Sequence, residues 1–212
     1  MRNPENDKRL FSRRIAGVSA KKIWLLRVGV SPLDGRGKGR VKKKTIMPRH
    51  NSLGKINWRE EPRASDMERV REIVVSSGFF SEAEIGVAVE LVEERLKKGV
   101  ESGYHFVFAE QDRKVTGYSC FGPIPCTAES YDIYWIAVQE ELRGSGLGVE
   151  VLKRVEGKIR EMGGKRIYVE TSSREQYRPT RSFYSRCGYR KEATLESFYA
   201  HGDHKVIYLR VL

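Results

Sequence analysis

The sequence contains few of the residues that build disulfide frameworks or metal sites. Its 212 residues include 3 cysteines and 4 histidines. The cysteines, Cys120, Cys126 and Cys187, are odd in number and form no CxxC pair, which argues against a disulfide scaffold and a zinc site. The histidines have no metal-ligand spacing either. The composition therefore predicts reduced thiols, a cytoplasmic location and no bound metal.

Long hydrophobic runs are also missing. No stretch approaches the roughly 18 apolar residues of a membrane-spanning helix. Residues 23–30 form a short apolar stretch that Arg27 interrupts, and no small-residue cleavage site follows it. A secretion signal is therefore not expected there, and neither is a membrane partner.

Positive charge is concentrated at one end of the chain. The formal net charge is +12, and residues 1–55 hold 16 of the 40 Lys and Arg but only 3 of the 28 Asp and Glu. Such a basic segment repels itself and rarely folds alone. We predict a disordered extension over residues 1–55, with Met47 as an alternative start, and one domain over residues 56–212. The extension is either a solvated tail or an arm for nucleic acid or an acidic partner.

Residues 56–212 alternate between strand and helix patterns. Ser81 and Glu84 form a capping-box pattern for a helix that closes near Gly99. Ser65 is the expected cap of the helix before it. The polar pair Asp112-Arg113 predicts a hairpin turn. The order predicts an α/β fold with a mixed sheet and antiparallel hairpins at both ends. Strands are expected at residues 56–60, 104–111, 114–121, 131–138, 166–171, 189–195 and 205–211.

A glycine-rich loop follows the strongest of these strands. Its glycines allow successive backbone N–H groups to face one anion, and the helix that follows adds partial positive charge. A P-loop is excluded because Val149-Glu150 stands where Lys-Ser/Thr is required. A dinucleotide fingerprint needs glycine at position 149, although Glu170 has the spacing of its acidic residue. The loop predicts a pyrophosphate site of another kind, over residues 143–148.

This loop resembles that of the GNAT N-acetyltransferase superfamily. Arg143, Gly146 and Gly148 match the family's Gln/Arg-x-x-Gly-x-Gly/Ala pattern. Residues 134–138 look like its fourth strand, and residues 183–189 look like its Phe-Tyr-x-x-x-Gly-Phe/Tyr segment. The resemblance covers about residues 56–212. It implies an acyl-CoA N-acyltransferase fold with splayed central parallel strands and a C-terminal β-hairpin.

The resemblance also implies an activity and a donor site. The activity would be acetyl transfer from acetyl-CoA to a primary amine, by direct attack in a ternary complex. The donor would lie between the splayed strands, where peptide groups of one strand pair with its pantetheine and the loop holds its pyrophosphate. The residues implied in donor binding are Ile136, Ala137, Val138, Arg143, Gly144, Ser145, Gly146, Leu147 and Gly148.

Catalytic roles follow from the same resemblance. Tyr184 matches the tyrosine that protonates the leaving thiolate as a general acid. The acceptor ammonium must lose a proton before it attacks. Glu170, at the carboxyl end of a central strand, is the first candidate for the base, and Asp132 is the second. The remaining candidates for the base are Glu129, His201 and His204.

The chain departs from the family where an Asn-x-x-Ala pattern precedes the Phe-Tyr pair. Tyr177 and Thr180 stand there, so the pantetheine contact of that Asn is not carried over. The polar loop over residues 171–179 instead shapes the acceptor pocket, with Arg174 or Arg178 meeting an acidic group, or is simply solvated. A small amine or amino acid is the expected acceptor. A protein N-terminus, a non-catalytic acyl-CoA-binding regulator and a homodimer stay open.

Overall fold

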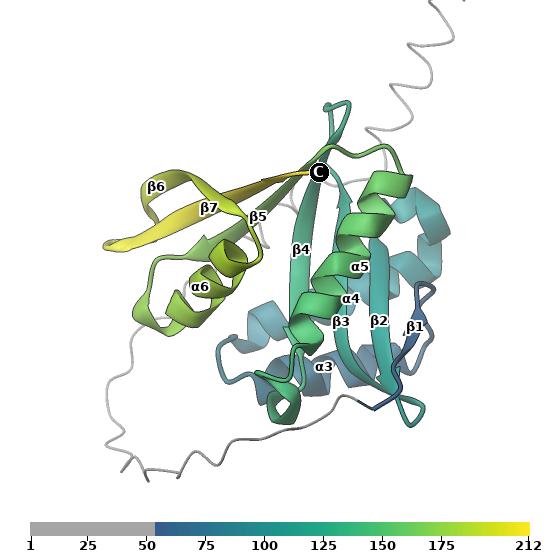
Figure 1. The fold of residues 1–212 in the computed structure, drawn as a ribbon. Helices are drawn as coiled ribbons and strands as arrows, with labels where there is room; N and C mark the ends of the chain where they lie inside the picture. The colour runs from purple at the N-terminus through teal and green to yellow at the C-terminus, as the bar shows by residue number, and fades with distance from the viewer. Residues whose placement is uncertain (1–53) are drawn as a thin grey trace, which may run out of the picture.

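The computed structural model describes residues 54–212, so the predicted extension lies outside the described residues except at its end. The described chain forms one seven-stranded sheet in the order β1-β2-β3-β4-β5-β7-β6 (Figure 1). Only β4 and β5 pair in parallel, and all other neighbours are antiparallel. The predicted α/β class, the mixed sheet and the hairpins at both ends are confirmed. The elements are β1 (Asn57–Arg59), α3 (Asp66–Ser76), α4 (Glu82–Lys98), β2 (His105–Gln111), β3 (Lys114–Pro123), β4 (Ser130–Val138), α5 (Leu147–Glu161), β5 (Arg166–Ser172), α6 (Arg178–Arg186), β6 (Arg190–Ala200) and β7 (Asp203–Val211).

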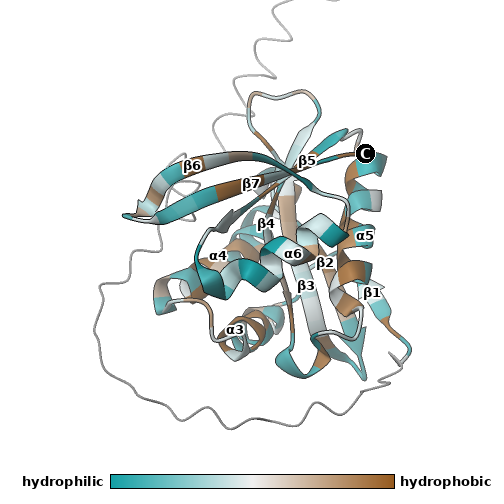
Figure 2. Cartoon of the chain, turned by 60° about the vertical axis from the view of Figure 1, so that its left-hand side comes forward, coloured by the Kyte–Doolittle hydropathy of each residue, from teal (hydrophilic) through white to brown (hydrophobic). Residues whose placement is uncertain are grey.

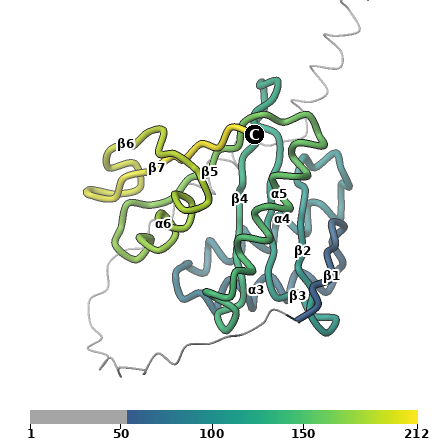
Figure 3. Tube along the Cα trace, in the orientation of Figure 1, coloured from purple at the N-terminus to yellow at the C-terminus, as the bar shows by residue number. Residues whose placement is uncertain are grey.

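Helices cover the two faces of the sheet unequally. Helices α3 and α4 pack on one face with apolar side chains of β2, β3 and β4. Helices α5 and α6 lie on the other face, where α5 crosses the central strands and α6 lies beside β5 and β7 (Figures 1 and 3). Across residues 54–212, no helix combines the length and apolar character that crossing a membrane requires.

Local sequence signals explain most element boundaries. The capping box at α4 is present, with the Ser81 hydroxyl accepting from the Glu84 N–H and the Glu84 carboxylate accepting from the Ser81 N–H. Asp112 and Arg113 both adopt positive φ, at 49° and 64°, as a tight two-residue hairpin turn requires. Ser65 occupies the N-cap position of α3 as predicted, but its side chain makes no capping hydrogen bond.

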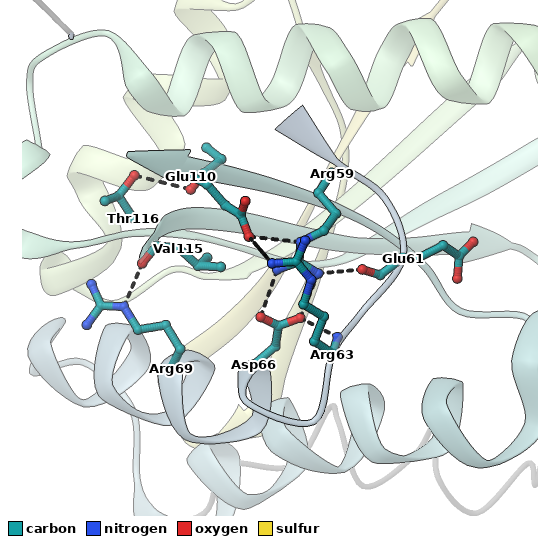
Figure 4. A network of polar contacts seen from close by, with 9 residues as sticks. Arg59, Glu61, Arg63, Asp66, Arg69, Glu110, Val115 and Thr116 are labelled. Carbon is teal, nitrogen blue, oxygen red and sulfur yellow. Dashed lines mark hydrogen bonds and ion pairs between the residues drawn. The ribbon is translucent and has the colours of Figure 1, made fainter. Parts of the chain in front are cut away.

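An ion-pair network fixes β1 to the start of α3 (Figure 4). The Arg59 guanidinium donates to both carboxylate oxygens of Asp66, each at 2.8 Å, and to Glu110 of β2 at 2.9 Å. The Asp66 side chain is 3% exposed and also accepts from the backbone N–H of Arg63. Desolvation lowers the pKa of Arg59, but its hydrogen bonds to the Asp66 and Glu110 carboxylates and their negative charges outweigh this effect and raise that pKa overall. The network therefore holds the edge of the sheet in register.

Candidate functional site

The parallel strands β4 and β5 separate part of the way along their length. Their pairing runs from Ser130 opposite Arg166 to Ile133 opposite Val169 and then stops. At this point β4 carries one extra residue, Tyr134, relative to the register of β3. A β-bulge of this kind bends a strand and increases its twist. Beyond it, β4 continues beside β3 and β5 continues beside β7, so the two strands diverge toward the start of α5 (Figure 1).

This divergence leaves one edge of β4 open. The Gln139 N–H donates to the Thr116 carbonyl of β3 at 2.8 Å. Backbone groups of successive strand residues point to opposite sides, so those of Val138 and Ile136 point away from β3. They face the side where β5 no longer pairs with β4. Peptide groups in a buried or half-buried position need a hydrogen-bond partner there. The side chains of Ile136, Ala137 and Val138 are all partly buried.

The glycine-rich loop lies directly after this open edge. Gly144 and Gly146 have φ angles of 77° and 94°, which favour glycine, and a Cβ on either would meet no atom within 4 Å. Helix α5 begins at Leu147. Within residues 54–212, the N–H groups of Gly144, Gly146 and Gly148 donate to no acceptor. Free N–H groups at the start of a 15-residue helix form a site that suits a phosphate or pyrophosphate.

Arg143, the first residue of the loop, is directed elsewhere. Its guanidinium lies 5.4 Å from the centre of the Phe79 ring, in the connection between α3 and α4. Phe79 in turn lies 6.1 Å from the ring of Tyr177, whose hydroxyl donates to the Phe79 carbonyl at 3.4 Å. These contacts connect the two sides of the divergence near the loop.

Tyr184 lies on the α6 side of the gap. Its ring packs among Phe183, Tyr189 and Tyr208, at centroid distances of 5.3, 5.6 and 6.0 Å. Burial and the nearby Cys187 raise the pKa of Tyr184, so the phenol stays protonated at neutral pH. Within the described chain the Tyr184 hydroxyl makes no hydrogen bond. The Tyr189 hydroxyl is also unpaired but is fully enclosed by the protein, whereas the Tyr184 hydroxyl is not. The hydroxyl is therefore placed to donate to a group outside the chain.

Glu170 lies just beyond the last pairing of β4 with β5, on the opposite face from Tyr184. Val169 belongs to the apolar cluster that contains Tyr184, so its neighbour Glu170 points to the other side of the sheet. The Glu170 carboxylate forms an ion pair with Lys205 of β7 at 3.0 Å. The Lys205 side chain is only 2% exposed, and its ammonium lies 3.6 Å from the centre of the Phe198 ring.

The structure separates the other candidate bases. Asp132 pairs with Tyr168 before the strands diverge, on the same face as Glu170 but two residues earlier along the strand. Glu129 precedes β4 and pairs with Lys165, at the end of the strands away from the gap. His201 lies in the exposed turn between β6 and β7, and the His204 Nδ1 accepts from the Ser197 N–H at 2.8 Å within the hairpin. Of the sequence candidates, Glu170 alone lies where the gap opens.

The loop after β5 is fixed by residues that the sequence patterns did not single out. Asp203, at the start of β7, accepts from the Ser172 hydroxyl and forms an ion pair with Arg174. Arg181 of α6 donates to the carbonyls of Ser172 and Arg174, at 2.7 and 2.9 Å. A signal for Asp203 and Lys205 was present, because both are charged and stand at alternate positions just before the apolar residues 206–209. Their partners depend on strand pairing, which spacing alone does not give.

Comparisons with known proteins agree with this geometry. Residues 67–189 match the model of the acetyltransferase (GNAT) family. A solved structure from Desulfovibrio desulfuricans, assigned to the GNAT family of acetyltransferases, is 44% identical, with a TM-score of 0.73 over 74% of this chain and 99% of that chain. No curated protein matches the sequence.

Two further solved structures share the fold at low sequence identity. One is PaiA N-acetyltransferase from Thermoplasma acidophilum in complex with coenzyme A, 19% identical, with a TM-score of 0.60 over 75% of this chain and 100% of that chain. The other is the ribosomal-protein-S18-alanine N-acetyltransferase from Escherichia coli. It is 14% identical, with a TM-score of 0.59 over 74% of this chain and 94% of that chain.

Proposed function

The chain belongs to the acetyltransferase (GNAT) family and is thus an N-acyltransferase; we propose that it transfers acetyl from acetyl-CoA to the primary amine of a small, amino-acid-type acceptor. The observation that carries this proposal is the open edge of β4, which leads directly into the glycine-rich loop at the start of α5. A similar fold from Thermoplasma acidophilum was solved with coenzyme A, which supports use of an acyl-CoA here.

Donor binding would use the backbone more than side chains. The peptide groups of Ile136 and Val138, with Ala137 between them, would pair with the pantetheine amides in place of the missing strand. The pyrophosphate would lie against residues 143–148, where the N–H groups of Gly144, Gly146 and Gly148 have no acceptor in the described chain. Arg143 would move from the Phe79 ring toward the phosphates or remain stacked as a wall of the site.

In forming the amide, the acceptor ammonium loses two protons, one before the attack and one as the tetrahedral intermediate collapses, and the leaving sulfur gains one. Acetyl-CoA supplies the acetyl group as a thioester. Glu170 would take a proton from the acceptor ammonium, directly or through water, so that the amine can attack the thioester carbon. Tyr184, protonated because burial raises its pKa, would give its proton to the departing sulfur. The two groups lie on opposite faces of the gap, which matches attack from one side and departure toward the other.

Thermal melting tests donor binding first. Acetyl-CoA or CoA at about 100 times its Kd should stabilise the protein by about 2.7 kcal/mol, whereas ADP should stabilise it less. Gly146→Glu should remove this shift, because a carboxylate would occupy the anion site. Gly163→Glu is the matched control, since Gly163 also has positive φ and open surroundings but lies at the far end of α5. Equal shifts in both variants would contradict the proposed pyrophosphate site.

Acetyl transfer is then tested with a panel of amines, amino acids and peptides. Formation of an acetylated amino acid or amine, together with one CoA thiol per turnover, supports the proposal. If a peptide N-terminus is acetylated in preference to amino acids and amines, the acceptor is a protein and not a small molecule. Donor binding without transfer to any acceptor would favour a non-catalytic acyl-CoA-binding regulator instead.

A further inference from the structure

Two ion pairs lie next to each other on one face of the β5–β7 pair. Glu170 and Ser172 are alternate residues of β5, and Asp203 and Lys205 are alternate residues of β7. Ser172 is directly opposite Lys205, so all four side chains point to the same face. Glu170 pairs with Lys205 at 3.0 Å, and Asp203 pairs with Arg174 at 3.0 Å. The Glu170 carboxylate and the Arg174 guanidinium therefore belong to two ion pairs whose β7 members, Lys205 and Asp203, are alternate residues.

The Arg174 guanidinium is held in one orientation from several sides. Its Nε lies 3.0 Å from Asp203 Oδ2, and the Asp203 side chain is 9% exposed. The Asp203 carboxylate is itself fixed by the Ser172 hydroxyl, which donates to its other oxygen. The backbone N–H of Arg174 donates to Ser172 Oγ at 3.0 Å, and the guanidinium lies 5.5 Å from the Tyr177 ring centre. Little side-chain freedom is left for Arg174 to lose on binding a ligand.

One side of this guanidinium is unused by the chain. Within residues 54–212, the Nη1 and Nη2 atoms of Arg174 donate to no acceptor, and the side chain is 47% exposed. Two parallel N–H bonds from such a planar group fit the two oxygens of a carboxylate. Arg178 offers no equivalent, because its side chain is 73% exposed and pairs with the neighbouring, equally exposed Glu175.

We propose that Arg174 binds the carboxylate of a free amino acid acceptor, with Glu170 facing its amino group; this rests on the proposed acetyl transfer. Lys205 and Asp203, the β7 partners of the two groups, are two residues apart, which is roughly 7 Å along the strand and the scale of a short zwitterion. Asp203 acts as a positioning residue, because it touches Arg174 and not the acceptor. The acceptor class is thereby an amino acid with an unblocked carboxylate.

The test compares amino acids with their primary amides, which keep the amine and lose the carboxylate. The wild-type enzyme should prefer the acid of each pair. Arg174→Met should lower kcat/KM for the acid by about 10- to 100-fold, mainly through KM, as expected for loss of a hydrogen-bonded charge contact. It should leave the amide rate and the melting shift with acetyl-CoA unchanged. Arg178→Met, in the same loop, is the matched control and should change neither rate.

Two further variants, at Arg174 and Asp203, test whether the guanidinium and its orientation determine the preference for the acid. Arg174→Lys retains the charge without the planar fork and should fall between the wild type and Arg174→Met. Asp203→Asn should raise KM for the acid while leaving kcat for the amide near the wild-type value.

If Arg174→Met does not fold, the test uses the ratio of kcat/KM for the acid to kcat/KM for the amide, measured for the wild type and for Arg174→Lys. Equal rates on acid and amide, or equal losses on both, would overturn the role of Arg174 while leaving acetyl transfer intact. Absence of transfer to every amine would overturn the proposed function itself.

Discussion

One face of the sheet changes character between its two halves. Over β2, β3 and β4 this face is apolar and covered by α3 and α4, with Phe106, Phe108 and Trp135 in a buried cluster. Over β5 and β7 the same face carries Glu170, Asp203 and Lys205. In Figure 2, β7 is teal toward the tip of the β6–β7 hairpin, where it starts, and brown in its middle.

This contrast is consistent with donor binding by one half of the sheet and acceptor selection by the other. In the proposed function, the first half would bind the acyl-CoA through backbone groups, whatever the acceptor is. The second half would select the acceptor through its charged side chains. A fold shared by proteins of low identity can then keep one donor and change its acceptor. Perturbing each half separately tests this division, because rate, stability and acceptor preference should change independently.

Tyr184→Phe should produce the largest effect on rate. Loss of a general acid lowers kcat by about 100- to 10,000-fold. The melting temperature should stay near that of the wild type, because the hydroxyl makes no hydrogen bond within the described chain and the ring is retained. Steady-state kinetics and melting with acetyl-CoA give both values. A variant that loses donor binding along with its rate would show that Tyr184 acts in packing and not in proton transfer.

Asp66→Asn should have the largest effect on stability. The substitution leaves Arg59, whose side chain is 12% exposed, without its two-oxygen partner. Removing one member of a buried pair costs about 3–5 kcal/mol. Urea unfolding measures this loss, and the exposed Glu68→Gln in the same helix is the control. The acid-to-amide ratio of the surviving activity should not change, and a change in that ratio would break the proposed separation of the two halves.

The sequence predicted those parts of the molecule that short-range chemistry determines. The Ser81–Glu84 capping box, the turn at Asp112-Arg113 and the loop around Gly146 each depend on residues within a few positions of one another. The element order followed from these signals together with apolar periodicity. The resemblance then indicated that β4 and β5 separate, and the register shows this at Ile133 and Val169.

Features that depend on distant partners were not predicted. In α4, Leu96 is 39% exposed, whereas the charged Arg95 beside it is buried. Arg95 takes that position because its guanidinium donates to the Tyr104 carbonyl and to Glu61. Lys205 was missed as the partner of Glu170 for the same reason, since the β5–β7 register sets the contact. Arg174 and Arg178 were both candidates for an acidic group, and the ion pair of Arg174 with Asp203 distinguishes the two in the structure.

Ser81→Ala should have a moderate effect on stability, and Ser81 belongs to the first half because it caps α4. Ser81 caps α4 next to Phe80, whose ring lies 4.9 Å from that of Trp135. Loss of the capping hydrogen bond should cost about 1 kcal/mol of unfolding free energy. Chemical denaturation measures it, and Ser81→Asp should restore most of the loss because aspartate is also a good cap. If Ser81→Ala changes KM for the acceptor more than it changes stability, the first half also contributes to acceptor binding.

His105 should give the smallest effect, visible only as a pH dependence. Burial, and then the charge of Arg95, lower the pKa of His105 from its ordinary value of 6.5. The unfolded chain therefore binds this proton more readily, so the free energy of unfolding falls as the pH drops through 6.5 toward the lower native value. His105→Gln should flatten that part of the profile between pH 7.5 and 5.5, whereas the exposed His201→Gln is the matched control. A wild-type profile that His105→Gln leaves unchanged would mean that the surroundings of His105 beside Phe121 accommodate the charged imidazole without loss of stability.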